Sequence, residues 1–185
     1  MTFRGFIAVD IPRSPALDAL AADLRKASPS LKVVATDQLH LTVKFLGDTE
    51  EGLIPEIVAA IREATSGAQP FEMRVRGTGA FPSLSRMNVI WVGVEGAEPL
   101  AKIAEALESA LESLGFPRER RSWTAHVTLA RVKGSRDLEP VRRVLESHAT
   151  DLFGTSTVDV VHLKKSVLTP QGARYTIVES VGLRG

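Results

Sequence analysis

Two of the four histidines in the chain stand in matching tetrapeptides. HLTV begins at His40 and HVTL begins at His126, so each histidine has a threonine two residues later, Thr42 and Thr128. An unperturbed imidazole titrates near about pH 6.5, so one neutral ring can accept a proton while a second, charged ring donates one. Threonine hydroxyls can donate hydrogen bonds to phosphate oxygens as negative charge develops on them. The combination predicts acid–base chemistry at a phosphodiester.

A zinc site is the competing interpretation of a histidine pair. A catalytic zinc usually takes three protein ligands, and neither tetrapeptide has an acidic residue or a second histidine at ligand spacing. We therefore expect no metal and no cofactor. The other two histidines lack a threonine partner: His148 lies near the end of a predicted helix and His162 lies in an apolar run, and we expect both to be structural.

The residues around each pair alternate as in a strand with one solvent-facing side. Because residues i and i+2 of a strand face the same side, each histidine should stand beside its threonine. In the first strand the solvent-facing side should carry His40, Thr42 and Lys44, and the core side should carry Leu39, Leu41, Val43 and Phe45.

Hydrophobic periodicity predicts the same order of elements twice. Strands are predicted at residues 4–10, 38–46, 71–79, 88–95, 123–132, 157–168 and 174–181, and helices at 14–27, 51–66, 99–115 and from about 137. The two units of β-α-β-α-β are offset by 86 residues, the difference between positions 126 and 40. Such a duplication predicts a pseudo-two-fold arrangement that brings equivalent residues to one groove.

Composition sets the class of protein. A chain of 185 residues with 44% hydrophobic residues fits one domain, residues 1–185, with a real core. Without cysteine it can form no disulfide, and residues 1–12 contain no long apolar stretch, so we expect a cytoplasmic protein that does not enter a membrane. The net charge is only +1, so phosphate binding must rely on local clusters such as the basic residues between 118 and 136: Arg118, Arg120, Arg121, Arg131, Lys133 and Arg136.

The chain resembles the two-histidine (2H) phosphoesterase superfamily, in particular its branch of RNA 2′,3′-cyclic phosphodiesterases and 2′-5′ RNA ligases. The resemblance covers nearly the whole chain, in the segments RGFIAVDIP, HLTVKFLGD, GTGAFPS, NVIWVGVEG, SWTAHVTLARV and SVLTPQGARYTIV. It implies an α+β, bilobal fold in which two antiparallel sheets flank a central groove with helices outside. Two departures stand out: Ala125 replaces the usual proline before the second histidine, and Lys164-Lys165 stand where an acidic residue is expected.

The resemblance also implies roles for particular residues. His40 would be the proton donor to the departing 3′-oxygen and His126 the proton acceptor from water, with Thr42 and Thr128 as their partners. Arg131 is a further candidate phosphate ligand, although it lies three residues after Thr128 and would face the other side unless a bulge intervenes. Lys44 and Phe81 are additional candidates for substrate binding; a core position is the alternative for Phe81.

The expected activity is hydrolysis of an RNA 2′,3′-cyclic phosphate end to a 2′-phosphomonoester, with 2′-5′ RNA ligation as its reverse. Two alternatives remain open. One is a phosphodiesterase for a small cyclic nucleotide or an ADP-ribose cyclic phosphate, and the other is a module that binds phosphate-ended RNA without turnover. The expected partner is thus RNA with a cyclic phosphate end or a small cyclic phosphate, and the expected form is a monomer.

Overall fold

The computed structural model describes residues 1–134 and 137–184. Its strands are β1 (Thr2–Asp10), β2 (Leu31–Val33), β3 (His40–Glu50), β4 (Phe71–Ser83), β5 (Arg86–Glu95), β6 (His126–Val132), β7 (Leu152–Val158), β8 (Val160–Thr169) and β9 (Gly172–Gly182). Its α-helices are α1 (Pro15–Ala27), α2 (Ile54–Ala64), α3 (Glu98–Glu112) and α4 (Glu139–Ser147), and short 3₁₀ helices η1 (Thr36–Gln38) and η2 (Glu51–Leu53) precede β3 and α2. All four predicted helices are present. The strand β2 was not predicted, and the strand predicted at 157–168 is two strands that meet at Asp159.

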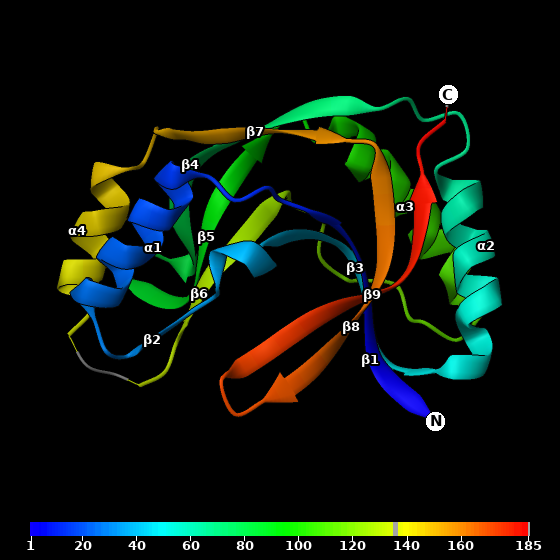
Figure 1. Cartoon of the computed structure of the whole chain (residues 1–185), viewed down its shortest axis with the longest axis horizontal. Helices are drawn as coiled ribbons and strands as arrows, with labels where there is room; N and C mark the ends of the chain where they lie inside the picture. The colour runs from blue at the N-terminus through cyan, green and yellow to red at the C-terminus, as the bar shows by residue number, and fades with distance from the viewer. Residues whose placement is uncertain (135–136, 185) are drawn as a thin grey trace.

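The strands form one curved antiparallel sheet in the order β7-β4-β5-β6-β3-β1-β8-β9, with β2 paired to β6 (Figure 1). The two strands that carry the tetrapeptides, β3 and β6, are neighbours at its centre and pair at Leu41 and Val127. The α+β class and the two-lobed arrangement are confirmed. The two expected sheets are continuous through this central contact.

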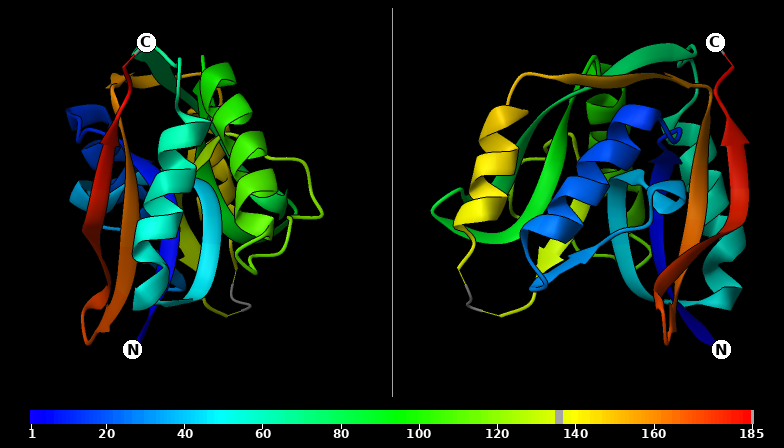
Figure 2. Two further views of the ribbon diagram at one scale, coloured as in Figure 1. Left: turned by 90° about the vertical axis from the view of Figure 1, so that its right-hand side faces the viewer. Right: turned by 60° about the vertical axis from the view of Figure 1, so that its left-hand side comes forward.

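Each half of the sheet, with its helices, forms a lobe. The first lobe contains β3, β1, β8 and β9 with α2 and α3, and the second lobe contains β6, β5, β4, β7 and β2 with α1 and α4 (Figures 1 and 2). The helix that follows the first strand of each repeat crosses to the other lobe: α1 follows β1 but packs on α4 and β7, and α3 follows β5 but packs on α2 and β3. Both repeats therefore contribute to both lobes.

Local interactions fix this crossing at α1. The Ser14 hydroxyl caps the helix by accepting a hydrogen bond from the Leu17 backbone N–H at 3.1 Å. The same hydroxyl donates to the Phe153 carbonyl of β7 at 2.7 Å. The start of α1 is therefore attached to the second lobe. No helix within residues 1–134 and 137–184 is long and apolar enough to cross a membrane.

Both central strands carry a β-bulge directly after their threonine. The register between β1 and β3 shifts at Val43, the residue after Thr42, and the register between β5 and β6 shifts at Leu129, the residue after Thr128. An extra residue on one strand reverses the facing of every residue beyond it relative to simple alternation. The side chains beyond each bulge consequently point to the sheet face opposite to the one that alternation predicts, on β3 as far as a second register shift at Leu46.

Candidate active site

The two histidines lie on the same face of the sheet. Leu41 and Val127 pair across β3 and β6 and both are fully buried beneath the helices, so the residues that flank them face the other side. On either side of the Leu41–Val127 pair, the antiparallel register sets His40 opposite Thr128 and Thr42 opposite His126. All four side chains are half-buried on this side, which we call the groove face. The backbone register therefore places the two histidine–threonine pairs on one surface, as expected.

Both imidazoles are oriented by the same backbone contact. Nδ1 of His40 lies 3.0 Å from the Gln38 carbonyl oxygen, and Nδ1 of His126 lies 2.9 Å from the Thr124 carbonyl oxygen, in each case two residues earlier in the chain. A carbonyl oxygen can only accept, so Nδ1 must carry the hydrogen in both rings. Nε2 of each ring is then the atom that gains or loses a proton.

Aromatic rings enclose His40. Its ring centroid lies 4.9 Å from that of Phe6 on β1 and 4.7 Å from that of Tyr175 on β9, and Phe6 and Tyr175 also meet edge to face at 5.4 Å. The Tyr175 backbone N–H donates to the Gln38 side-chain carbonyl at 3.0 Å. Gln38 therefore contacts both His40 and the β8–β9 hairpin, and the hairpin helps to fix the orientation of the ring.

A second aromatic group supports His126. Phe81 on β4 meets the His126 ring edge to face at 5.1 Å and meets Trp91 on β5 at 5.4 Å. The Trp91 indole lies directly over Gly79, where a Cβ would come within 2.2 Å of the ring, so only glycine fits there. Phe81 is 36% exposed, which excludes the core position considered for it and places it at the rim beside His126.

A charged group adjoins His40 on β1 and β8. Asp10 stands opposite His40 in the β1–β3 register, accepts a hydrogen bond from the buried Lys164 ammonium, and lies 3.6 Å from Nε2 of His162. His162 also bonds the Ser180 hydroxyl through Nδ1 at 2.8 Å. This histidine is buried on the groove face, whereas His148 bonds Asp151 at the end of α4.

The environment of His40 shifts its titration. Burial lowers the pKa of His40 below its ordinary value of 6.5, and the Lys164 cation lowers this pKa further, while the hydrogen bond to the Gln38 carbonyl and the Asp10 carboxylate act in the opposite direction. Burial likewise lowers the pKa of His162. Burial and the Lys164 cation thus favour the neutral form of His40.

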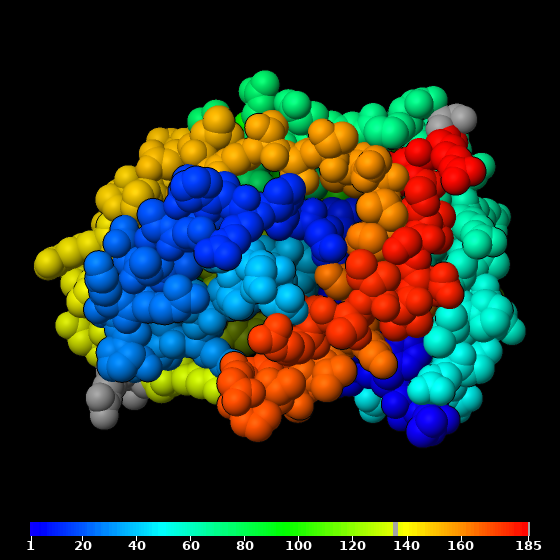
Figure 3. All heavy atoms as spheres, in the orientation of Figure 1, coloured from blue at the N-terminus to red at the C-terminus, as the bar shows by residue number. Residues whose placement is uncertain are grey.

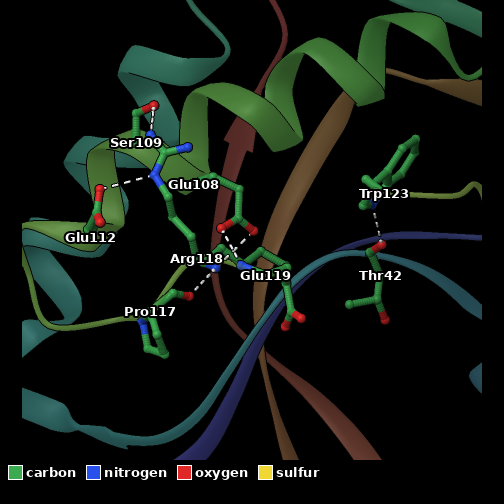
Figure 4. Close-up of polar contacts among 9 residues, drawn as sticks. Thr42, Glu108, Ser109, Glu112, Pro117, Arg118, Glu119 and Trp123 are labelled. Carbon is green, nitrogen blue, oxygen red and sulfur yellow. Dashed lines mark hydrogen bonds and ion pairs between the residues drawn. The ribbon is translucent and has the colours of Figure 1, made fainter. Parts of the chain in front are cut away.

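The expectation that Lys44 shares the solvent-facing side with His40 is wrong. The bulge at Val43 turns Lys44 into the interior, where its side chain is 1% exposed and its ammonium donates to Glu108 Oε1 at 2.9 Å and to the Pro117 carbonyl at 3.1 Å. The other Glu108 oxygen accepts from the Glu119 backbone N–H at 2.9 Å (Figure 4). Lys44 therefore stabilises the segment after α3 and is not available to a substrate.

The same bulge exposes Phe45. Alternation placed this residue on the core side, but its side chain is 60% exposed, and it stands opposite Phe6, on the groove face.

Trp123 joins the two tetrapeptides. Its indole Nε1 donates to the Thr42 carbonyl oxygen at 3.2 Å, as Figure 4 shows. Trp123 lies three residues before His126, so the segment that leads into the second histidine is attached to the backbone of the first pair.

The bulge at Leu129 brings Arg131 to the groove face. In a strand without the bulge, Arg131 would face away from Thr128. Because of the bulge, Arg131 is exposed and lines a pocket between the lobes. Of the other described members of the basic cluster predicted at 118–136, none lines this pocket. Arg118 bonds Glu112 and Ser109 on α3 (Figure 4), and Arg136 lies outside the described residues.

Several residues of the site were not singled out as candidates from the sequence. Gln38, Trp123 and Tyr175 act through contacts between elements far apart in the chain. Trp123 and Tyr175 lie in segments that carry the family resemblance, SWTAHVTLARV and SVLTPQGARYTIV, but those segments did not indicate which residues they contact. Within residues 1–134 and 137–184, no three His, Cys, Asp or Glu side chains gather as metal ligands would.

Comparisons with known proteins agree with this geometry. A family model described as the 2′-5′ RNA ligase superfamily matches residues 11–167. The chain is 34% identical over 181 residues to an RNA 2′,3′-cyclic phosphodiesterase of Methanothermobacter thermautotrophicus, covering 97% of this chain and 98% of that protein. It is 37% identical over 152 residues to an RNA 2′,3′-cyclic phosphodiesterase of Aeropyrum pernix, covering 82% of this chain and 85% of that protein.

Solved structures show the same fold. A crystal structure from Thermus thermophilus superposes with a TM-score of 0.77 at 31% identity and covers 98% of each chain. The structure of E. coli LigT complexed with 3′-AMP superposes with a TM-score of 0.72 at 22% identity over 100% of each chain. The arrangement of the two lobes is therefore shared beyond close sequence similarity.

Proposed function

Because the chain belongs to the 2′-5′ RNA ligase superfamily, we propose that it hydrolyses RNA 2′,3′-cyclic phosphate ends to 2′-phosphomonoesters. The observation that carries the proposal is the pairing of β3 with β6, which sets His40 and His126 on one face, each with Nδ1 bonded to a backbone carbonyl so that Nε2 is the atom that exchanges a proton. The relatives named RNA 2′,3′-cyclic phosphodiesterase favour an RNA end over a small cyclic nucleotide, and over binding without turnover.

In the proposed reaction water attacks the phosphorus atom and gives its proton to Nε2 of His126. The bond between phosphorus and the 3′-oxygen breaks, and Nε2 of His40 gives its proton to that oxygen. The products are a 2′-phosphomonoester and a 3′-hydroxyl. His126 leaves the step charged and His40 neutral, and exchange with solvent restores both. Each transfer typically contributes about 10² to 10⁴ in rate.

The remaining groups stabilise charge. The hydroxyls of Thr42 and Thr128, each beside its histidine, would donate to the non-bridging oxygens as negative charge builds on them. Imidazoles and hydroxyls together supply an acid, a base and anion stabilisation, so we propose that no metal is required. One chain provides both histidines, and we propose that a monomer acts in the cytoplasm.

The lowered pKa of His40 is consistent with a proton donor that becomes charged when the substrate phosphate binds. A bound phosphate carries negative charge, which favours the protonated ring and so offsets the effect of burial. An acid with a lowered pKa then gives up its proton readily to the departing oxygen.

Ligation would be the same opening of the cyclic phosphate by a different nucleophile. A 5′-hydroxyl in place of water would attack the same phosphorus and form a 2′-5′ linkage with the same proton transfers. Water at about 55 M favours hydrolysis unless the 5′-hydroxyl is held with a high effective concentration.

The test incubates the protein, with chelator present, with an oligoribonucleotide that ends in a 2′,3′-cyclic phosphate. We expect a product that matches an authentic 2′-phosphate standard by mass, chromatography and phosphatase sensitivity. A 3′-phosphate, or no reaction until metal is added, would contradict the proposal.

A sulfur-containing substrate tests the two histidine roles separately. When sulfur replaces the bridging 3′-oxygen, the leaving group departs as a thiolate and needs no proton. We expect His40→Ala to lower the rate by about 10² or more on the oxygen substrate but only slightly on the sulfur substrate. His126→Ala should lower the rate by about 10² or more on both substrates. The opposite pattern would exchange the two roles.

A further inference from the structure

A pocket of about 350 Å³ opens between the lobes on the groove face. Its walls are β2 and the residues after it, the end of β6, and the turn of the β8–β9 hairpin. Figure 3 shows this hollow between the blue segment that carries β2 and the orange hairpin turn. The two lobes thus share one pocket beside the candidate active site.

The pocket adjoins both histidines. Gln38, whose carbonyl oxygen orients His40, lines it together with Tyr175, whose ring packs on His40. Arg131, three residues beyond Thr128 on the same sheet face, lines it from the second lobe. A ligand whose reacting group lies at the histidines would extend into this pocket.

The charged residues of the pocket are all positive. Arg25, Lys32, Arg131 and Arg174 line it, and none of its described lining residues is acidic. Among residues 1–134 and 137–184, no carboxylate lies within 4.0 Å of the charged nitrogens of these four side chains. In a chain with a net charge of only +1, this is a local concentration of positive charge.

The cations approach one another across different elements. Lys32 on β2 stands directly opposite Arg131 on β6, a like-charge pair that destabilises a sheet. The Lys32 side chain also reaches the hairpin, since a Cβ on Gly172 would lie 3.7 Å from its Nζ. Arg174 follows two residues later on β9. Such repulsion is relieved when an anion occupies the space between the cations.

We infer that this pocket binds the phosphodiester on the 5′ side of the terminal nucleoside, one linkage before the cyclic phosphate. The inference rests on the proposed function and specifies its substrate class as RNA ends of at least two nucleotides. A nucleoside 2′,3′-cyclic monophosphate with a free 5′-hydroxyl has no anion for the pocket. Lys32 and Arg174 are then residues that determine substrate specificity.

The experiment compares two dinucleotides that end in the same 2′,3′-cyclic phosphate and differ only in the linkage between their nucleotides. One carries a phosphodiester, which is anionic, and the other carries a methylphosphonate, which has nearly the same shape without the charge. The ratio of their kcat/KM values measures how much the negative charge of the linkage contributes to recognition of the substrate. A charge-assisted hydrogen bond is typically strong enough to change this ratio by a factor on the order of ten or more.

We expect the wild-type protein to prefer the phosphodiester by about 10-fold to 100-fold, and the preference to fall to about threefold or less in the Lys32→Gln/Arg174→Gln double variant. Glutamine keeps a polar side chain of similar reach and removes the charge. Lys102→Gln, which removes an exposed cation from α3, is the matched control and should retain the wild-type ratio. The single variant Arg174→Gln should give an intermediate ratio.

The outcomes separate the inference from the function on which it rests. Equal turnover of both dinucleotides by the wild-type protein would overturn the inference and leave the proposed function intact. An unchanged ratio in the double variant, with circular dichroism showing a folded protein, would overturn it as well. Turnover of neither dinucleotide would refute the proposed function, and the inference with it.

Discussion

Replacing Lys44 by methionine distinguishes a residue that stabilises the fold from one that binds substrate. The alternation of the strand placed Lys44 beside His40, whereas the bulge at Val43 places its ammonium on Glu108 and the Pro117 carbonyl. Methionine keeps the length and the aliphatic contacts of the lysine but donates no hydrogen bond. The substitution therefore removes the charge with little change in packing.

The size of the effect follows from the burial of the pair. The side chain of Lys44 is 1% exposed and that of Glu108 is 18% exposed. Removing one partner of a buried ion pair typically costs about 3–5 kcal/mol, and the partial exposure of Glu108 lets water compensate some of this. We expect the free energy of unfolding to fall by about 2–4 kcal/mol, which for a chain of this size lowers Tm by roughly 5–15 °C.

Thermal and urea denaturation measure this loss, and kcat/KM measured well below the Tm of the variant should stay within about threefold of the wild-type value. The double variant Lys44→Met/Glu108→Leu removes the stranded carboxylate and should recover at least about half of the lost stability. If Lys44→Met left the stability unchanged and raised KM by about tenfold, the interior position of Lys44 and the bulge that produces it would be refuted.

Two further predictions concern Trp123 and pH. Trp123→Phe removes the hydrogen bond to the Thr42 carbonyl at 3.2 Å. We expect the free energy of unfolding to fall by about 1–2 kcal/mol, and kcat to fall by about threefold to tenfold with a smaller change in KM. An unchanged kcat in steady-state assays would show that this contact does not position His126. The second prediction follows from burial, which lowers the pKa of His40 and of His162 below 6.5. Below that pH the unfolded chain binds more protons than the folded one, so stability is fully present above about pH 6.5 and falls with acidification, at most by about 1.4 kcal/mol per pH unit for each histidine. Urea denaturation at pH 7, 6 and 5 should show this decline, and His162→Gln should make it shallower; the same slope in the variant would contradict the burial argument for His162.

The parts of the fold that sequence alone predicted are those set by local patterns. Apolar residues at helical spacing predicted α1, and the alternation around the tetrapeptides predicted β3 and β6, because both patterns reflect which side of an element is buried. The meeting of His40 with His126 followed from the repeat, since equivalent strands of a duplicated unit become neighbours.

The parts that sequence did not predict depend on contacts between elements. A bulge is defined by the register with a neighbouring strand, so the inward turn of Lys44 and the exposure of Phe45 could not be read from alternation. The three-residue strand β2 is too short for a periodic signal, yet it carries Lys32 to the pocket. The contact of Tyr175 with His40 joins positions far apart in the chain.

The exchange of α1 and α3 between the lobes has a consequence for the origin and assembly of the molecule. Two copies of a half-length chain, each lending its first helix to the other, would form the same architecture as a symmetric dimer with two identical histidines. A half produced alone would leave one side of its strands without a helix to cover it. The fused chain makes this mutual covering intramolecular, so the two imidazoles become neighbours at any protein concentration.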